Sequence, residues 1–272
     1  MFPFFIETIA NYSRSILPWF LLGIGFAYFV EKHLKSETIK RYIGVFSLQK
    51  TVSAIVLGMV SPLSIMSFLP VAREFVNLGA HAGMLFTFLV AERAYDLQSF
   101  FIITSLFGIR FAILNALAVF VSLFITAIAL KNERIKFVIH KEKRHNFWNQ
   151  QIRLFGIVMV GIFLSSLIRV SIPQEFFHQY AGNAGSGLVS GILSGFLIYL
   201  GPIIANYPLA KAFLDLGMVE IGVFAFLTIS PVINIVIFLL FGGVVGFRTV
   251  TKAFIVYGIT SLLLTLIFSL ML

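Results

Sequence analysis

Apolar residues run along this chain in long stretches, which short polar or proline-containing segments interrupt. Stretches of about 20 apolar residues recur from Ile16 to Leu272, and the segment 255–272 is apolar on every helix face instead of at alternate positions. About 20 residues is the length that an α-helix needs to cross the hydrocarbon core of a bilayer, and alternation is expected of a membrane β-barrel. The pattern therefore predicts an all-α polytopic membrane protein.

The pattern occurs twice, and the two copies align without a gap when Pro70 is laid on Pro208. At this shift, which we call the repeat offset, 11 identical residues fall among the 41 positions from Pro70 to Arg110, where usual residue frequencies would supply about three. A two-fold repeat in so apolar a chain is typical of secondary transporters. We therefore predict two transmembrane repeats, residues 1–138 and 139–272, joined by a polar linker at 131–150.

Each half shows the same order of predicted elements. A long apolar span comes first, and a short amphipathic segment follows it at 36–46 or 173–180. Next come a span that ends at proline, a short helix that begins with proline and ends at glycine (70–78 or 208–216), and two short apolar stretches separated by a break. A long span closes each half. The order predicts inverted repeats of about five segments each, eight to ten spans in total, with broken or re-entrant helices.

Charge gives the orientation. The formal net charge is +9, and the basic residues gather in the segments 31–50 and 131–150 beside apolar spans, where the positive-inside rule places cytoplasmic loops. If both segments are cytoplasmic, an even number of crossings separates them, so each half crosses an odd number of times and the second half is inverted. This distribution predicts a multi-pass protein of the prokaryotic plasma membrane that contacts lipids, and no nucleic-acid partner.

Several kinds of chemistry are not expected. The chain has no cysteine, which excludes disulfides, cysteine-based metal sites and thiol nucleophiles. It also lacks the familiar hydrolase and ATPase motifs, so we expect no enzyme, no cofactor and no metal. The N-terminal segment up to Val30 has no basic start and no cleavage site, so the first span is expected to be retained. Three glycines spaced at helical intervals predict close helix packing: Gly187, Gly191 and Gly195.

The first candidate site is a group of charges within apolar sequence. Glu92, Arg93 and Asp96 are flanked on both sides by apolar stretches, and a charge at membrane depth costs on the order of 3 kcal/mol. Glu92 and Asp96 are four residues apart, so on a helix they would share a face. We interpret them as substrate-binding residues and proton acceptors, with Arg93 as counter-charge or anion partner. The alternative is that the break lies at the membrane interface and the charges are solvated.

The second candidate site lies at the corresponding place in the second half. Ser230, Pro231 and Asn234 place a helix breaker and neutral hydrogen-bonding groups where the first half has charges. A broken helix frees backbone groups, and its half-helix N-terminus attracts anions. We expect the two breaks to face each other near the membrane midplane and to bind the substrate.

Further polar residues accompany the prolines. Ser64, Ser67, Asn206 and Tyr207 either line the same path or satisfy backbone groups that the prolines free. His81 and Glu220 begin the next apolar stretches, where an interfacial position is favoured over a proton-transfer role. Two basic residues that flank the last spans are expected to be interfacial anchors: Arg110 and Lys252.

The repeated motifs resemble a known family. The first copy reads Pro70-Val-Ala-Arg-x-Phe-x-x-x-Gly79, then Phe86-x-Phe-Leu89; the second reads Pro208-Leu-Ala-Lys-x-Phe-x-x-x-Gly217, then Phe224-x-Phe-Leu-x-x-Ser-Pro-x-x-Asn234. In these motifs the chain is similar to the predicted permease family that includes the bacterial organoarsenical efflux permeases. The resemblance implies a permease and does not name a cargo.

The chain departs from the family pattern at two places. Family members often carry cysteines just before the first of these prolines, where this chain has Ser64 and Met66. In the first half Arg93-Ala-Tyr-Asp96 replaces the family's Pro-x-x-Asn. We therefore do not expect an arsenical site that depends on thiols. We expect a more polar or charged substrate.

These observations predict a secondary active transporter that moves a small anionic or polar solute by alternating access, with proton coupling. Its partners would be a small-molecule or ion substrate and membrane lipids, and a homo-oligomer is compatible with the sequence. Two alternatives remain open. One is an uncoupled channel or facilitator with the same architecture, and the other is a non-transporting membrane scaffold or assembly factor.

Overall fold

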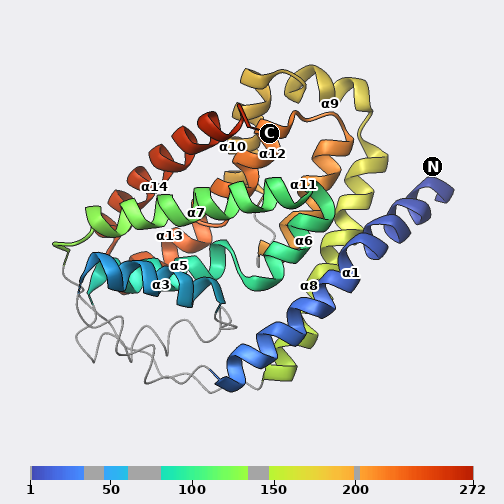
Figure 1. Cartoon of the computed structure of the whole chain (residues 1–272). Coiled ribbons are helices and arrows are strands. Elements are labelled where there is room, and N and C mark those ends of the chain that lie inside the picture. The colour runs from blue at the N-terminus through green and yellow to red at the C-terminus, as the bar shows by residue number, and fades with distance from the viewer. Residues whose placement is uncertain (1, 34–45, 61–80, 134–146, 199–202, 272) are drawn as a thin grey trace.

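The chain folds into helices throughout its described ranges. The structure, a computed structural model, describes residues 2–33, 46–60, 81–133, 147–198 and 203–271 (Figure 1). Within these ranges there are twelve α-helices, one short 3-10 helix and no strand. The predicted all-α class is confirmed.

The helices of the first half are α1 (Phe2–His33), α3 (Leu48–Val60), α5 (Ala82–Ala94), α6 (Leu97–Phe107) and α7 (Ile109–Ala129). Those of the second half are α8 (Phe147–Ser171), α9 (Gln174–Ala181), α10 (Ala184–Leu197), η1 (Ile203–Ala205), α11 (Asn206–Asp215), α12 (Glu220–Ile229), α13 (Ile235–Val245) and α14 (Phe247–Phe268).

The helix bounds follow the repeat offset. Helix α13 begins and ends at the counterparts of the first and last residues of α6, while α12 and α14 begin at the counterparts of the first residues of α5 and α7. The corners at Gly108 and Gly246 correspond as well, since both glycines have a φ of 91°. No atom lies within 4 Å of a Cβ built at either position, so the backbone conformation, and not crowding, favours glycine there.

Glycines bring helices together in pairs in both halves. Near its end α3 approaches α5, where Gly58 lies against the backbone of Phe88. In the second half Gly187, Gly191 and Gly195 line the face of α10 that packs on α12 and on Ser230 beyond it. The prediction of close helix packing by these three glycines is confirmed. In each pair the two helices run in the same direction.

The two halves meet along α7 and α14, which lie side by side and run in opposite directions (Figure 1). At one end, Lys252 near the start of α14 binds Glu133 just beyond the end of α7. At the other end the rings of Phe111 and Phe268, from the start of α7 and the end of α14, both contact the ring of Phe224.

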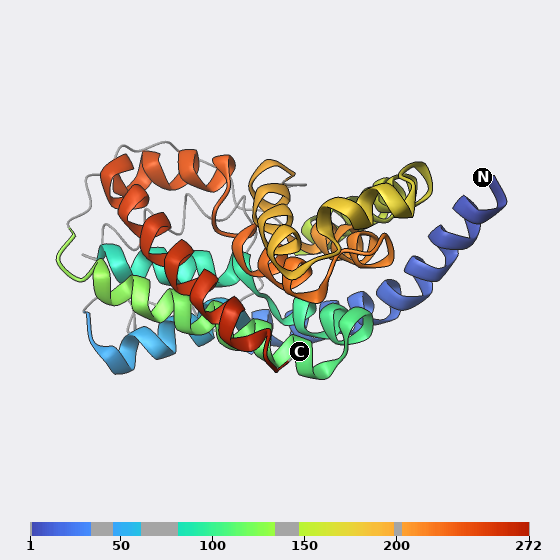
Figure 2. The same ribbon diagram turned by 90° about the horizontal axis from the view of Figure 1, so that it is seen from above.

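Helices α1 and α8 form a second antiparallel contact between the halves. The ring of Phe20 lies 6.2 Å from that of Phe155, and the ring of Phe5 lies 5.6 Å from that of Phe163. Figure 2 shows the N-terminal end of α1 at one edge of the molecule, where the Arg169 guanidinium of α8 lies 5.7 Å from the centre of the Phe4 ring. Phe4 and Ile6 in the first turns of α1 are about half exposed.

Two of the described helices, α7 and α14, are long and apolar enough to cross a membrane on length and composition alone. Several others are apolar but shorter, among them α3, α5, α6, α10 and α12. The short helices are those that the sequence associates with helix breakers.

Candidate functional site

The first helix break lies between α5 and α6. Helix α5 ends at Ala94, Tyr95 has an extended backbone (φ −161°, ψ 99°), and Asp96 is the N-cap of α6. The Asp96 Oδ1 accepts hydrogen bonds from the Ser99 backbone N–H and from the Ser99 hydroxyl, both at 2.6 Å. A carboxylate at this position satisfies backbone donors that the helix leaves unpaired and complements the helix dipole.

The prediction that Glu92 and Asp96 share one helix face is wrong. Helix α5 ends between them, because Asp96 caps the next helix with its side chain instead of continuing the first. Aspartate favours such caps because it bonds to nearby backbone donors. The backbone of Glu92 belongs to α5, but its side chain lies outside the described part of the structure.

Arg93 lies in the last turn of α5 and is only 7% exposed. The adjoining Tyr95 is also buried, and its hydroxyl donates to the Ala112 carbonyl of α7 at 2.9 Å. Burial of this degree is unusual for an arginine. Desolvation of a guanidinium costs free energy, so a buried arginine next to the break distinguishes this place from an ordinary helix end.

The second break separates α12 from α13. Ser230 and Pro231 form a turn after Ile229, and Asn234 is the N-cap of α13. The Asn234 Oδ1 accepts from the Ile237 N–H at 2.9 Å, while its Nδ2 donates to the Ser230 carbonyl at 2.8 Å. The Ser230 hydroxyl is buried and has no hydrogen-bond partner among the described residues.

The two breaks therefore correspond in their backbone roles. Asp96 and Asn234 are counterparts at the repeat offset, and each caps the backbone N–H three residues further on. They differ in chemistry, because Ser99 supplies a hydroxyl to Asp96 whereas its counterpart Ile237 is apolar.

Residues of the second half reach the first break. The Tyr207 hydroxyl at the start of α11 donates to the Ser99 hydroxyl oxygen, and both residues are buried. The Gln98 Nε2 in α6 also donates to the Gln151 Oε1 in α8 at 3.2 Å. Tyr207 is one of the polar residues that the sequence places in the proline-containing segment 201–208, but its contact with the first break was not predicted.

A short stretch of α7 contacts both breaks. Ala112 accepts the hydrogen bond from Tyr95, and three residues later the Asn115 Nδ2 donates to the Thr228 Oγ1 of α12 at 2.9 Å. The Thr228 carbonyl accepts from the Tyr257 hydroxyl of α14 at 2.9 Å. Both breaks are thus tied to the helices through which the halves pack.

The remaining predicted site residues are only partly described. Asn206 is completely buried at the start of α11, next to Tyr207. Ser64 and Ser67 lie in the segment 61–80, outside the described residues. Within the described ranges, no group of three or more His, Asp or Glu side chains is placed to hold a metal ion.

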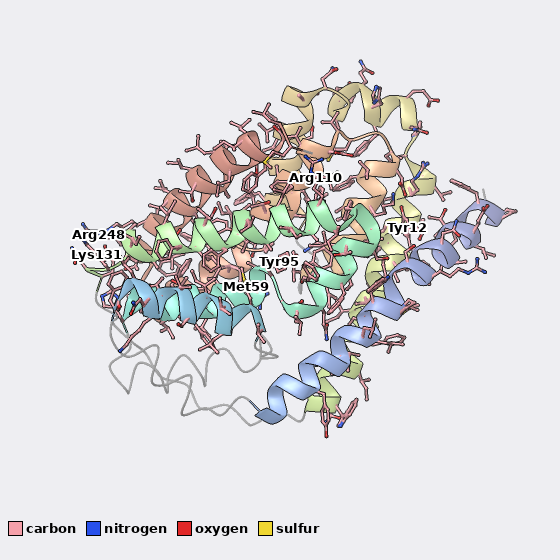
Figure 3. All side chains as sticks on the ribbon, viewed as in Figure 1. Tyr12, Met59, Tyr95, Arg110, Lys131 and Arg248 are labelled. Carbon is pink, nitrogen blue, oxygen red and sulfur yellow. The ribbon has the colours of Figure 1, made fainter. Side chains whose placement is uncertain are left out.

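The two ends of α7 carry different charge arrangements. Figure 3 shows Lys131 and Arg248 at one end and Arg110 towards the other. At the first end the Lys252 Nζ lies 2.9 Å from the Glu133 Oε1, and this hydrogen bond, with the Lys252 and Arg248 charges, lowers the pKa of the Glu133 carboxyl. At the other end Arg110 lines a cavity of about 150 Å³ together with Glu220.

Comparison with known proteins agrees with the motif analysis. Residues 2–132 match the family model ArsP_1, described as a predicted permease. The matched region contains α1 to α7 and the whole of the first break. No curated protein and no solved structure matches the chain. Over its first half, the chain thus matches the predicted permease family that its motifs resemble.

Proposed function

We propose that the protein is a secondary transporter that moves a small anionic or polar solute across the prokaryotic plasma membrane by alternating access. The observation that carries the proposal is the pair of helix breaks in matching register, capped by Asp96 and Asn234, in a chain whose first half matches a permease family. Discontinuous helices at equivalent positions of two repeats are where transporters bind substrate.

Helix lengths support a position of the breaks inside the membrane. Helices α5 and α6 have 13 and 11 residues, so end to end they span about 36 Å. Helices α12 and α13 have 10 and 11 residues and span about 32 Å in the same way. Each pair would cross a hydrocarbon core of about 30 Å once, with its break near the middle.

The other helices complete an odd number of crossings per half. Helices α3 and α10 have 13 and 14 residues, too few to cross alone. The end of α11 returns to α9, since Phe213 contacts Phe177 and the Gly217 carbonyl contacts His178. Helices α10 and α11 would therefore form a re-entrant hairpin. The second half would then have three crossings and one such hairpin, and it would be inverted relative to the first half, which the opposite directions of α7 and α14 support.

The two breaks are suited to different parts of a transport cycle. The N-terminus of α6 is already compensated by the Asp96 carboxylate, whereas that of α13 is capped by a neutral amide. The second break could therefore bind an anionic group, with the Ser230 hydroxyl as a further donor. Glu92 and Asp96 would accept the coupling proton, and Arg93 would be their counter-charge. Pro231, Asn206, Ser64 and Ser67 would line the same path.

The test is a thermal-stability screen of the detergent-purified protein against oxyanions, organoarsenicals, organic acids and metal ions at two pH values. A ligand at a hundredfold excess over its dissociation constant stabilises the folded state by about 2.7 kcal/mol. We expect a hit that disappears in Ser230→Ala, whose hydroxyl supports no other described group, and in Glu92→Gln. Lys131→Gln, at the far end of α7, is the matched control and should retain it.

Two rival functions give different results. An uncoupled channel would show flux in liposomes that neither saturates nor responds to a proton gradient. A membrane scaffold would show no ligand response, with Glu92→Gln as stable as the wild type, and would retain a partner in gentle purification. Either result would refute the transporter proposal.

A further inference from the structure

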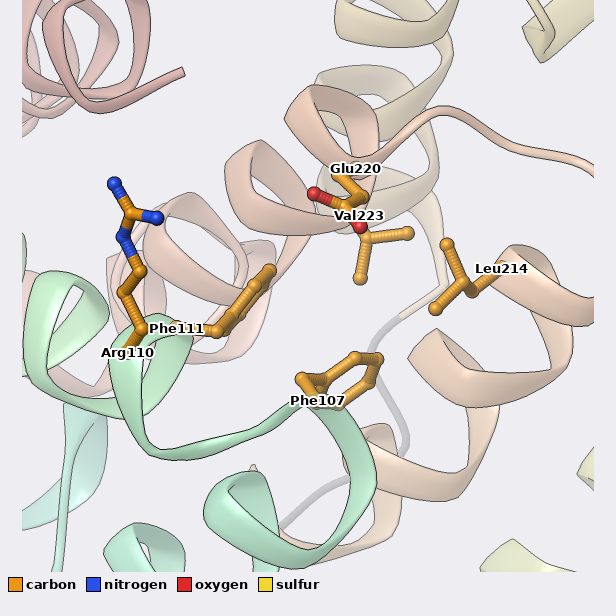
Figure 4. A pocket seen from close by; sticks show the side chains of 6 residues that line it. All are labelled: Phe107, Arg110, Phe111, Leu214, Glu220 and Val223. Carbon is orange, nitrogen blue, oxygen red and sulfur yellow. The ribbon is translucent and has the colours of Figure 1, made fainter. Parts of the chain in front are cut away.

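A cavity lies between the two halves, away from the helix breaks. It has a volume of about 150 Å³, and Figure 4 shows three lining residues from each half. The first half contributes Phe107, Arg110 and Phe111 from the α6–α7 corner. The second half contributes Leu214 from α11 and Glu220 and Val223 from α12.

The inner wall of this cavity is apolar. The rings of Phe107 and Phe111 stack at 5.0 Å, and Phe111 and Val223 are buried. An apolar cavity of about 150 Å³ in another protein accommodates a benzene molecule. The space therefore suits one ring-sized apolar group, and any charged part of the same molecule would lie beside the exposed Arg110 and Glu220 side chains.

The cavity also carries one charge of each sign. Arg110 and Glu220 are both exposed, and among the described residues neither makes an ion pair. In Figure 4 the two side chains belong to different helices and extend separately. A solute with a single charge is attracted by one of them and repelled by the other. A solute with both charges, suitably oriented, gains both attractions.

The corresponding residues at the other end of the molecule show that this arrangement is not simply repeated. Arg248 is the counterpart of Arg110 at the repeat offset, but the counterpart of Glu220 is Ala82. The acid near Arg248 is Glu133, which is paired with Lys252. Opposite charges are neutralised within the protein at that end and face a cavity at this one.

We propose that this cavity binds a small zwitterion with a ring-sized apolar group, its anionic group at Arg110 and its cationic group at Glu220. This proposal deepens the proposed function. It rests on that function in one respect, because it treats the cavity as a site through which the transported solute enters. Binding itself is measured at equilibrium without transport. Its failure would therefore leave the helix breaks as the substrate site, and failure of transport would leave the binding result standing.

The experiment is isothermal titration of the full-length protein in detergent with three probes that share a phenyl ring. L-Phenylalanine carries both charges, 3-phenylpropionate only the negative charge and 2-phenylethylamine only the positive charge, with titration into empty micelles as the blank. We expect saturable binding of phenylalanine at least tenfold tighter than that of the other two. No saturable binding, or equal affinity for all three probes, would overturn the proposal.

Variants assign the two charges. Arg110→Gln and Glu220→Gln should each weaken phenylalanine binding about tenfold, and Glu220→Gln should abolish the preference over 3-phenylpropionate. Arg248→Gln, at the counterpart position outside the cavity, should bind as the wild type does. Because Glu220 also lies in the first turn of α12, the folding of each variant is checked by its thermal midpoint, and Glu220→Asp should restore binding in part. Unchanged affinity in both Gln variants would contradict the proposed charge contacts.

Discussion

The breaks at Ala94–Asp96 and at Ser230–Asn234 cap the following helix in the same way and differ in length and in chemistry. In both, a polar side chain caps the following helix at the N–H three residues on. In the first break the cap is a carboxylate that accepts a hydrogen bond from the Ser99 hydroxyl. The Tyr207 hydroxyl of the other half donates in turn to the Ser99 hydroxyl oxygen. In the second break the cap is an amide, and Ile237 offers no side-chain donor.

The difference separates what the fold requires from what function would require. A helix that begins inside a membrane needs a cap, since its first N–H groups have no water to bond to. Either an aspartate or an asparagine meets that need. Only the aspartate adds a charge. Because the second break is capped without one, capping alone does not explain the charge in the first break. Four experiments test this comparison and the contacts near it.

The largest effect is expected when the second break is given the chemistry of the first. Asn234→Asp places a carboxylate at a fully buried position and removes the donor to the Ser230 carbonyl. We expect a loss of about 3 kcal/mol in the free energy of unfolding, measured in detergent. Adding Ile237→Ser to this variant should recover about 1 kcal/mol, because it supplies the hydroxyl that Ser99 supplies to Asp96. A stable single variant would mean that the second break tolerates charge as the first does.

Removal of the first cap should have the next largest effect. Asp96→Ala leaves the Ser99 N–H without an acceptor and should lower the free energy of unfolding by about 2 kcal/mol. Asp96→Asn, which copies the residue of the second break, should lower it by less than about 1 kcal/mol. If both variants lose the same stability, the charge of Asp96 itself stabilises the fold, and a neutral cap would not be sufficient at the first break.

The hydroxyl contact between the halves should contribute less. Tyr207→Phe removes the donor to the Ser99 hydroxyl and should cost about 1 kcal/mol. The matched measurement is a double-mutant cycle with Ser99→Ala, in which we expect a coupling of about 1 kcal/mol. A coupling near zero would show that the contact adds nothing to the packing of the tyrosine ring.

The ion pair at the far end of α7 should contribute least. Both partners are partly exposed, so Glu133→Gln should cost about 0.5 kcal/mol at neutral pH. Because the pKa of the folded carboxyl is lowered, this contribution is present above the unfolded value of about 4.3 and is lost as the pH falls through the folded value. Thermal midpoints of wild type and variant should therefore converge in acid. A gap that persists at low pH would mean that the electrostatic account is wrong.

Local features of this structure could be predicted from the sequence. The charged residues at 92–96 within apolar sequence, the Ser230-Pro231 pair and the repeat offset indicate the two breaks, and the spacing of three glycines indicates the packed face of α10. These features depend on residues close together in the chain. The prediction for Glu92 and Asp96 was wrong because spacing alone does not reveal that Asp96 caps a new helix.

Contacts between the halves could not be predicted in this way. The bond of Tyr207 to Ser99 joins residues 108 positions apart, and the cavity at Arg110 and Glu220 joins two helices of different halves. Such contacts depend on which helix faces pack against each other. Because many apolar faces of this chain have a similar composition, the sequence does not determine which of them meet. Arg110 and Glu220 read as interfacial residues in the sequence for this reason.

The glycine corners have a consequence for the order in which the protein folds. Gly108 and Gly246 each return the chain on itself within a single residue, so the contacts of α6 with α7 and of α13 with α14 are local. The Asn115–Thr228 bond spans 113 residues, and the Tyr12–Asp215 bond spans 203. Local contacts form early, and contacts distant in sequence form late. Each half would therefore assemble its own helical hairpin first, and the union of the halves would be the slow step.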